Sequence, residues 1–127
     1  FYGTPGLGAY SASKFALEGL SETLAAETAG FGVRVMIVEP GAINTRFISH
    51  GTSEAGRRLD AYAALSGGGK DVLNGYYEVG GEPPETVAEA VLAALDQPEL
   101  PSRLILGRDN RATIKGKLDA MQAQVAG

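Results

Sequence analysis

Residues 9–41 read AYSASKFALEGLSETLAAETAGFGVRVMIVEPG and join a long helical pattern to a short buried strand. Apolar and small residues recur at three- and four-residue spacing over residues 9–29, which predicts an amphipathic helix. The glycines that follow are typical of a helix end. The β-branched run at 33–38 predicts a strand covered on both faces, as in a parallel sheet, and a Pro-Gly pair ends it. The helix's predicted apolar face consists of Ala12, Phe15, Ala16, Gly19, Leu20, Thr23 and Leu24.

The sequence that follows repeats this alternation of helix and strand. We predict a helix over residues 83–97, a strand at 103–107 and an amphipathic helix over 110–127. This order favours the α/β class with a parallel sheet. Because two parallel strands are rarely stable alone, we interpret residues 1–127 as the C-terminal part of a single, larger doubly wound domain. The predicted apolar faces of the two later helices are Val87, Val91, Leu92 and Leu95, and Ile114, Leu118, Met121 and Val125.

Residues 42–82 form an irregular insertion between these elements, with one helix predicted at 52–65. Long insertions in compact domains are more often functional than idle. The GGGK sequence at 67–70 lacks the other residues of a phosphate-binding loop, so we interpret it as a turn. The only histidine, His50, has no second ligand at metal-binding spacing, and we expect no metal. The insertion's aromatic residues line a substrate site or pack the insertion onto the body: Phe47, Tyr62, Tyr76 and Tyr77.

The composition is that of a globular domain, with 44% hydrophobic and 20% charged residues among 127. The net charge of −4 argues against nucleic acid or an anionic membrane as a partner. The absence of cysteine excludes disulfides. No apolar run reaches membrane-spanning length and no signal peptide is visible, so we expect a cytoplasmic protein. The chain starts without methionine, which suggests a protein entered in the middle.

Tyr10 and Lys14 are four residues apart, so a helix places them on the same side. A free tyrosine titrates near about 10, too high for efficient proton transfer at neutral pH, and a nearby ammonium lowers that value. The pair is therefore a candidate for general acid–base catalysis. The alternative is structural: the tyrosine packs with its hydroxyl in water and the lysine extends to solvent.

AYSASKFALEGLSETLAAE followed by VRVMIVEPGAINTRF resembles the short-chain dehydrogenase/reductase family. The resemblance is strong over residues 1–48 and looser through the later helix and strand. It implies a Rossmann-type fold, NAD or NADP as cofactor, and hydride transfer between that cofactor and a small-molecule ketone or secondary alcohol. It further implies that Tyr10 gives or takes the substrate proton, and that Lys14 lowers the tyrosine's pKa and binds the nicotinamide ribose. The family is commonly a homodimer or homotetramer.

The resemblance also extends to the turn after the predicted strand. Pro40 and Gly41 match the turn beside the nicotinamide, Ile43 matches the position whose backbone holds the carboxamide, and Thr45 matches the residue whose hydroxyl reaches the carboxamide or pyrophosphate. Residues 46–80 correspond to the variable substrate lid.

Two parts of the family's machinery have no counterpart in this sequence. The glycine-rich phosphate loop is missing, and the position of the catalytic serine falls before Phe1. We therefore expect these 127 residues alone to bind no cofactor tightly and to be inactive. A non-catalytic NAD(P)-binding protein or an inactive half-protein stays open as an alternative. A nucleotide-sugar epimerase or dehydratase fits less well, because its substrate domain is larger than the insertion here.

Overall fold

The computed structural model describes residues 2–47, 56, 59–62, 74–75 and 80–126. It has three long helices and two short strands in the predicted order, so the expected α/β class is confirmed. The elements are α1 (Gly8–Thr28), η1 (Ala29–Phe31), β1 (Ile37–Glu39), η2 (Asp60–Tyr62), α5 (Pro84–Leu95), β2 (Arg103–Ile105) and α6 (Arg108–Val125).

The end of α1 follows from its glycines. The helix tightens into the single turn of η1, and Gly32 then adopts a left-handed conformation with φ of 73°. Its N–H donates to the Ala29 carbonyl at 3.3 Å. This conformation is costly for residues with a Cβ, so glycine allows the chain to reverse towards β1.

The two strands pair in parallel, with Ile37 opposite Arg103 and Glu39 opposite Ile105. The predicted parallel sheet is confirmed, but its first strand is shorter than predicted. Residues 33–36 have no strand geometry, and β1 begins only at Ile37. The reason is pairing: β2 spans three residues and is the only strand that pairs with β1 among the described residues.

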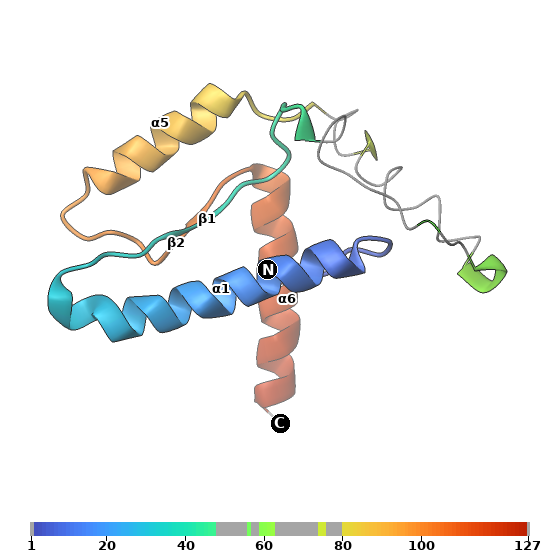
Figure 1. The fold of residues 1–127 in the computed structure, drawn as a ribbon, viewed down its shortest axis with the longest axis horizontal. Helices are drawn as coiled ribbons and strands as arrows, with labels where there is room; N and C mark the ends of the chain where they lie inside the picture. Colours follow the sequence, from blue (N-terminus) through green and yellow to red (C-terminus); the bar gives the residue numbers. More distant parts are fainter. Residues whose placement is uncertain (1, 48–55, 57–58, 63–73, 76–79, 127) are drawn as a thin grey trace.

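The helices lie around this ribbon of two strands (Figure 1). α1 and α5 run on opposite sides of the strands, whereas α6 leaves the end of β2 and crosses α1. The Lys117 ammonium lies 4.7 Å from the centre of the Phe15 ring, which joins α6 to α1. The strands therefore separate two helical layers, as in an α/β fold.

Few apolar side chains are buried against these elements. Among the described residues only Ala94 and Ile114 are buried hydrophobics. Most residues of the predicted apolar faces are exposed, because no described element covers them. The side of α1 that is half-buried carries Glu18, Ser21 and Ala25 instead. The exposed residues of the three predicted apolar faces are Ala12, Phe15, Ala16, Gly19, Leu20, Thr23, Leu24, Leu92, Leu95, Leu118, Met121 and Val125.

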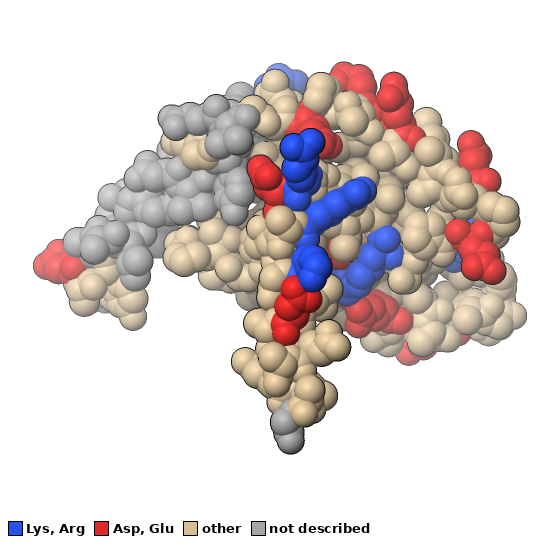
Figure 2. Space-filling view, turned by 180° about the vertical axis from the view of Figure 1, so that it is seen from behind, with Lys and Arg blue, Asp and Glu red and all other residues tan. Residues whose placement is uncertain are grey.

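The predicted insertion lies mostly outside the described residues, including His50, the GGGK turn, Tyr76, Tyr77 and most of the predicted helix 52–65. Of that helix, Asp60–Tyr62 form the short turn η2. No helix in the described part of the chain is long and apolar enough to cross a membrane. On the face shown in Figure 2, basic side chains gather around the start of α6 with acidic ones beside them.

Candidate active site

Tyr10 and Lys14 lie on the same side of α1. The Lys14 ammonium is 5.5 Å from the centre of the Tyr10 ring. Both side chains are exposed, Tyr10 to 43%. Neither the phenol nor the ammonium forms a hydrogen bond or ion pair with a described residue. The pair is thus held together by the helix itself, and its polar ends are accessible to a ligand.

The loop after β1 is held by a second segment of chain. Ile43 forms an isolated parallel bridge with Glu82. The Asn44 N–H donates to the Glu82 carbonyl at 2.9 Å, and the Glu82 N–H donates to the Ala42 carbonyl at 2.8 Å. The Ile43 N–H donates to no described residue, so it can serve as a backbone donor to a bound group.

Gly81 permits this close approach. A Cβ built at residue 81 would lie 2.8 Å from the Asn44 nitrogen and 2.9 Å from the Ile43 carbonyl carbon. Both are backbone atoms and cannot move aside as a flexible side chain would. Only glycine therefore allows residues 81–82 to pair with the loop. The sequence analysis missed Gly81, because nothing in its local pattern distinguishes it from Gly80.

The Pro40–Gly41 turn is held from α6. Asn110, which is only 7% exposed, donates its side-chain amide to the Glu39 carbonyl at 2.8 Å and to the Leu106 carbonyl at 3.1 Å. A Cβ at Gly41 would lie 3.5 Å from the Asn110 Cβ. The turn predicted to lie beside the nicotinamide thus packs on the first turn of α6. This contact could not be predicted from the sequence, because a polar residue such as Asn110 is ordinary in an amphipathic helix.

The helix and the loop meet at an aromatic contact. The Tyr10 and Phe47 rings are 5.8 Å apart between centres and inclined by 50°, within the range of favourable aromatic pairs. Thr45 supports Phe47, since its hydroxyl accepts the Phe47 N–H at 3.4 Å. The structure therefore brings the end of the predicted cofactor loop to Tyr10.

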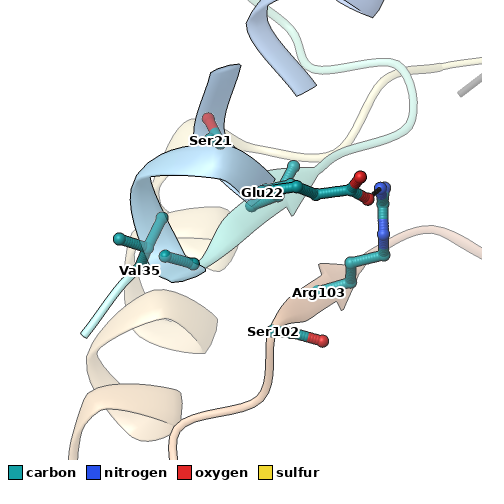
Figure 3. A pocket seen from close by; sticks show the side chains of 7 residues that line it. Ser21, Glu22, Val35, Ser102 and Arg103 are labelled. Carbon is teal, nitrogen blue, oxygen red and sulfur yellow. Dashed lines mark hydrogen bonds and ion pairs between the residues drawn. The ribbon is translucent and has the colours of Figure 1, made fainter. Parts of the chain in front are cut away.

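Arg103 of β2 links the helix to the strands (Figure 3). Its guanidinium contacts three carboxylates, at 3.0 Å from Glu18, 2.6 Å from Glu22 and 2.5 Å from Glu39. Figure 3 shows the contact with Glu22. The Glu18 and Glu39 side chains are mostly buried, at 13% and 9% exposure. The second Glu39 oxygen, Oε2, is buried without a hydrogen-bond partner among the described residues. We call these four residues the Arg103 cluster.

Interactions within the Arg103 cluster shift the pKa values of two of its members, Glu18 and Arg103. Burial raises the pKa of Glu18, but hydrogen bonding and charge, those of Arg103 among them, outweigh burial and leave that pKa lowered. Burial lowers the pKa of Arg103, but the hydrogen bonds to Glu22, Glu39 and Glu18 raise it overall. The Glu18–Arg103 pair is therefore ionised at neutral pH.

A small cavity of about 70 Å³ lies between α1 and the two strands, beside the Arg103 cluster. Ser21 and Glu22 border it from α1, and Ser102 and Arg103 from the start of β2. Small-molecule sites usually measure about 300–1,000 Å³, so this cavity is too small for a dinucleotide. Within the described residues, no group of acidic or histidine side chains is arranged to hold a metal ion.

Comparison with known proteins gives consistent matches. Residues 1–55 match the family model of the short chain dehydrogenases. The chain is 34% identical over 107 residues to oxidoreductase BOA17 of Botryotinia fuckeliana, and 40% identical over 93 residues to mouse 17-beta-hydroxysteroid dehydrogenase type 1. These alignments cover 84% and 71% of this chain. A crystal structure of a short-chain dehydrogenase from Streptomyces avermitilis superposes with a TM-score of 0.77 at 39% identity over 94% of this chain.

The chain spans less than half the length of these relatives. It covers 39% of BOA17, 27% of the mouse enzyme and 43% of the Streptomyces structure. The match to this crystal structure implies that the helices and strands of the chain are part of a Rossmann-type fold.

Proposed function

Because the chain belongs to the short-chain dehydrogenase family, we propose that it forms the C-terminal part of the Rossmann-type domain of an NAD(P)-dependent oxidoreductase. The reaction is reversible hydride transfer between the cofactor and a ketone or secondary alcohol. One observation carries the proposal: Tyr10 and Lys14 present accessible polar groups on one side of α1, next to the loop that follows β1. This is the arrangement that proton transfer to a substrate oxygen requires.

The donors at this site fit a nicotinamide nucleotide. The Lys14 ammonium forms no hydrogen bond or ion pair with a described residue, and the Ile43 N–H donates to none, so both can bind a ribose or a carboxamide. Thr45 and the Pro40–Gly41 turn complete the loop side. When bound, the nicotinamide supplies or accepts the hydride.

The residues of this chain handle the proton. In the reductive direction the Tyr10 hydroxyl donates a proton to the substrate's carbonyl oxygen, and in the oxidative direction the tyrosine oxygen accepts it from the alcohol. Phe47 gives the site an apolar wall beside Tyr10, which supports a substrate with apolar character.

Tyr10→Phe in the complete protein tests this proposal, because it removes only the proton-bearing oxygen. We expect turnover to fall by about 10² to 10⁴-fold while NAD(P)H affinity, followed by nucleotide fluorescence, changes little. Thr113→Val is the matched control, since it likewise removes one hydroxyl from an exposed helical residue, here on α6, for which no role in catalysis is proposed. Persistent turnover of Tyr10→Phe would refute the proton-transfer role, and wild-type cofactor binding without turnover would favour the non-catalytic alternative.

A further inference from the structure

The side chains that matter for chemistry and for anchoring form a single row on α1. Tyr10, Lys14, Glu18 and Glu22 follow one another at four-residue spacing. Residues at this spacing are neighbours on a helix surface. The first two members carry the proposed chemistry, and the last two belong to the Arg103 cluster. Lys14 therefore has two possible neighbours on the row, Tyr10 on one side and the Glu18 carboxylate on the other.

A lysine and a carboxylate at the same four-residue spacing also occur in α6, where they form an ion pair. Lys115 precedes Asp119 by four residues, and the two side chains form an ion pair at 2.7 Å although both are largely exposed. Lys14 precedes Glu18 by the same interval, yet it forms no ion pair with a described residue. Its ammonium instead lies over the Tyr10 ring.

One difference between the two helices is that Arg103 binds the acidic member of the pair on α1, Glu18. Its guanidinium binds the Glu18 carboxylate at 3.0 Å and is fixed by Glu39 on β1 and Glu22 on α1. A guanidinium bonded to several carboxylates is held firmly, because it presents its donors in a rigid fork. Glu18 is thereby directed towards the strands, and its side chain is only 13% exposed.

We propose that Arg103 is a positioning residue for the Tyr10–Lys14 pair: by binding Glu18, it keeps that carboxylate from capturing the Lys14 ammonium. Lys14 then stays with Tyr10 and accessible to a ligand. The consequence for turnover rests on the function proposed above, whereas the placement of Lys14 does not. Arg103 touches neither the substrate nor the reacting atoms, and it acts only through Glu18.

The first readout is the reactivity of Lys14 towards limiting acetic anhydride, measured by mass spectrometry of peptides from the complete protein. Ion pairing keeps an amine protonated and slows its acylation. We expect Arg103→Met to slow labelling of Lys14 by about tenfold, and Arg103→Met with Glu18→Gln to restore it. Lys115 is the internal standard, because its own ion pair is unchanged in every variant. This readout is independent of turnover.

The second readout is kcat in the same variants. We expect Arg103→Met to lower kcat about tenfold and the added Glu18→Gln to recover most of the loss. If Arg103 had only a structural role, adding Glu18→Gln would lower kcat further, because it changes another member of the Arg103 cluster. Lys115→Met is the matched control, since it removes an exposed lysine ion pair that has no member in the row or in the Arg103 cluster.

The outcomes separate the two proposals. If the wild-type protein lacks NAD(P)H-dependent turnover, the proposed function fails, and Lys14 labelling still decides the role of Arg103. If Arg103→Met does not give a native circular-dichroism spectrum, Arg103→Gln and Arg103→Lys are compared with and without Glu18→Gln. Unchanged Lys14 labelling in every folded Arg103 variant, or labelling that Glu18→Gln does not restore, overturns the inference.

Discussion

The two sides of the candidate site are built differently. The helix side, Tyr10 and Lys14, offers side chains that the four-residue spacing places on one side of α1. The loop side, from Pro40 to Thr45, offers mainly backbone groups, and these are held by residues 81–82 and by Asn110 of α6. Local geometry thus makes one side and tertiary contacts make the other. Substitutions at the loop supports should therefore change the site without touching a proposed ligand-binding residue.

The largest effect among the loop supports is expected for Gly81→Ala. The added methyl group would meet backbone atoms of Asn44 and Ile43 within 3 Å, so the loop or the 81–82 segment must shift. We expect NAD(P)H affinity to fall by about tenfold or more and the free energy of unfolding to fall by about 2 kcal/mol. Titration of nucleotide fluorescence and urea unfolding of the complete protein measure both.

Gly116→Ala is the control for this substitution, because nothing lies within 4 Å of a Cβ there and the residue is within α6. Alanine at that position should be neutral or stabilising. Equal cofactor affinity in Gly81→Ala and the wild-type protein would show that the loop does not depend on residues 81–82.

A smaller effect is expected for Asn110→Ala. The substitution removes the amide that donates to the Glu39 and Leu106 carbonyls in a buried position. Loss of this donor should lower the free energy of unfolding by about 1 kcal/mol. Asn110→Asp should destabilise at least as much, because a carboxylate cannot donate to these carbonyls.

Urea unfolding of both variants, with Gln124→Ala as an exposed α6 control, measures this difference. If Asn110→Asp were as stable as the wild-type protein, the donor role of Asn110 would be wrong and only its volume would matter.

The smallest effect concerns the helix side and its dependence on pH. The pKa of Glu18 is lowered in the folded chain from an ordinary value of 4.5. The ionised carboxylate is therefore favoured by folding, and its contribution to stability is present above about pH 4.5 and is lost as pH falls through the lower folded pKa. Glu18→Gln should reduce the loss of stability between pH 6 and pH 3. Identical pH dependence in the two proteins would contradict the ion pair with Arg103.

The sequence predicted the helix side well and the loop supports not at all. Four-residue spacing is a local signal, so Tyr10 and Lys14 could be placed on one side of a helix from the sequence, and the structure places them there. Their catalytic role, and the cofactor roles of Pro40, Gly41, Ile43 and Thr45, stay predictions. Gly81, Arg103 and Asn110 act across 37 to 85 residues of sequence, on partners that no local pattern identifies.

In the fold too, features that depend on neighbours in sequence were predictable and features that depend on distant contacts were not. Helix periodicity gave the long helices correctly, because it depends on neighbours within one turn. Both strands were predicted too long, the second over 103–107, because strand length depends on the pairing partner. The exposure of most of the predicted apolar faces could not be read from the sequence, because burial depends on which elements cover them. Leu92 matches the apolar period of α5 and is nevertheless 62% exposed, whereas the small residue Ala94, two positions later, is buried.

The four-residue row on α1 has a consequence for how this gene can change over evolution. One inserted or deleted residue between Lys14 and Glu18 would rotate the two halves of the helix by about 100° relative to each other. Tyr10 would then face away from the loop if Arg103 remained bound to Glu18 and Glu22. Substitutions at the intervening positions preserve the register, whereas changes of length do not. Divergence in this helix should therefore proceed by replacement, and length variation should accumulate in the segment after Phe47.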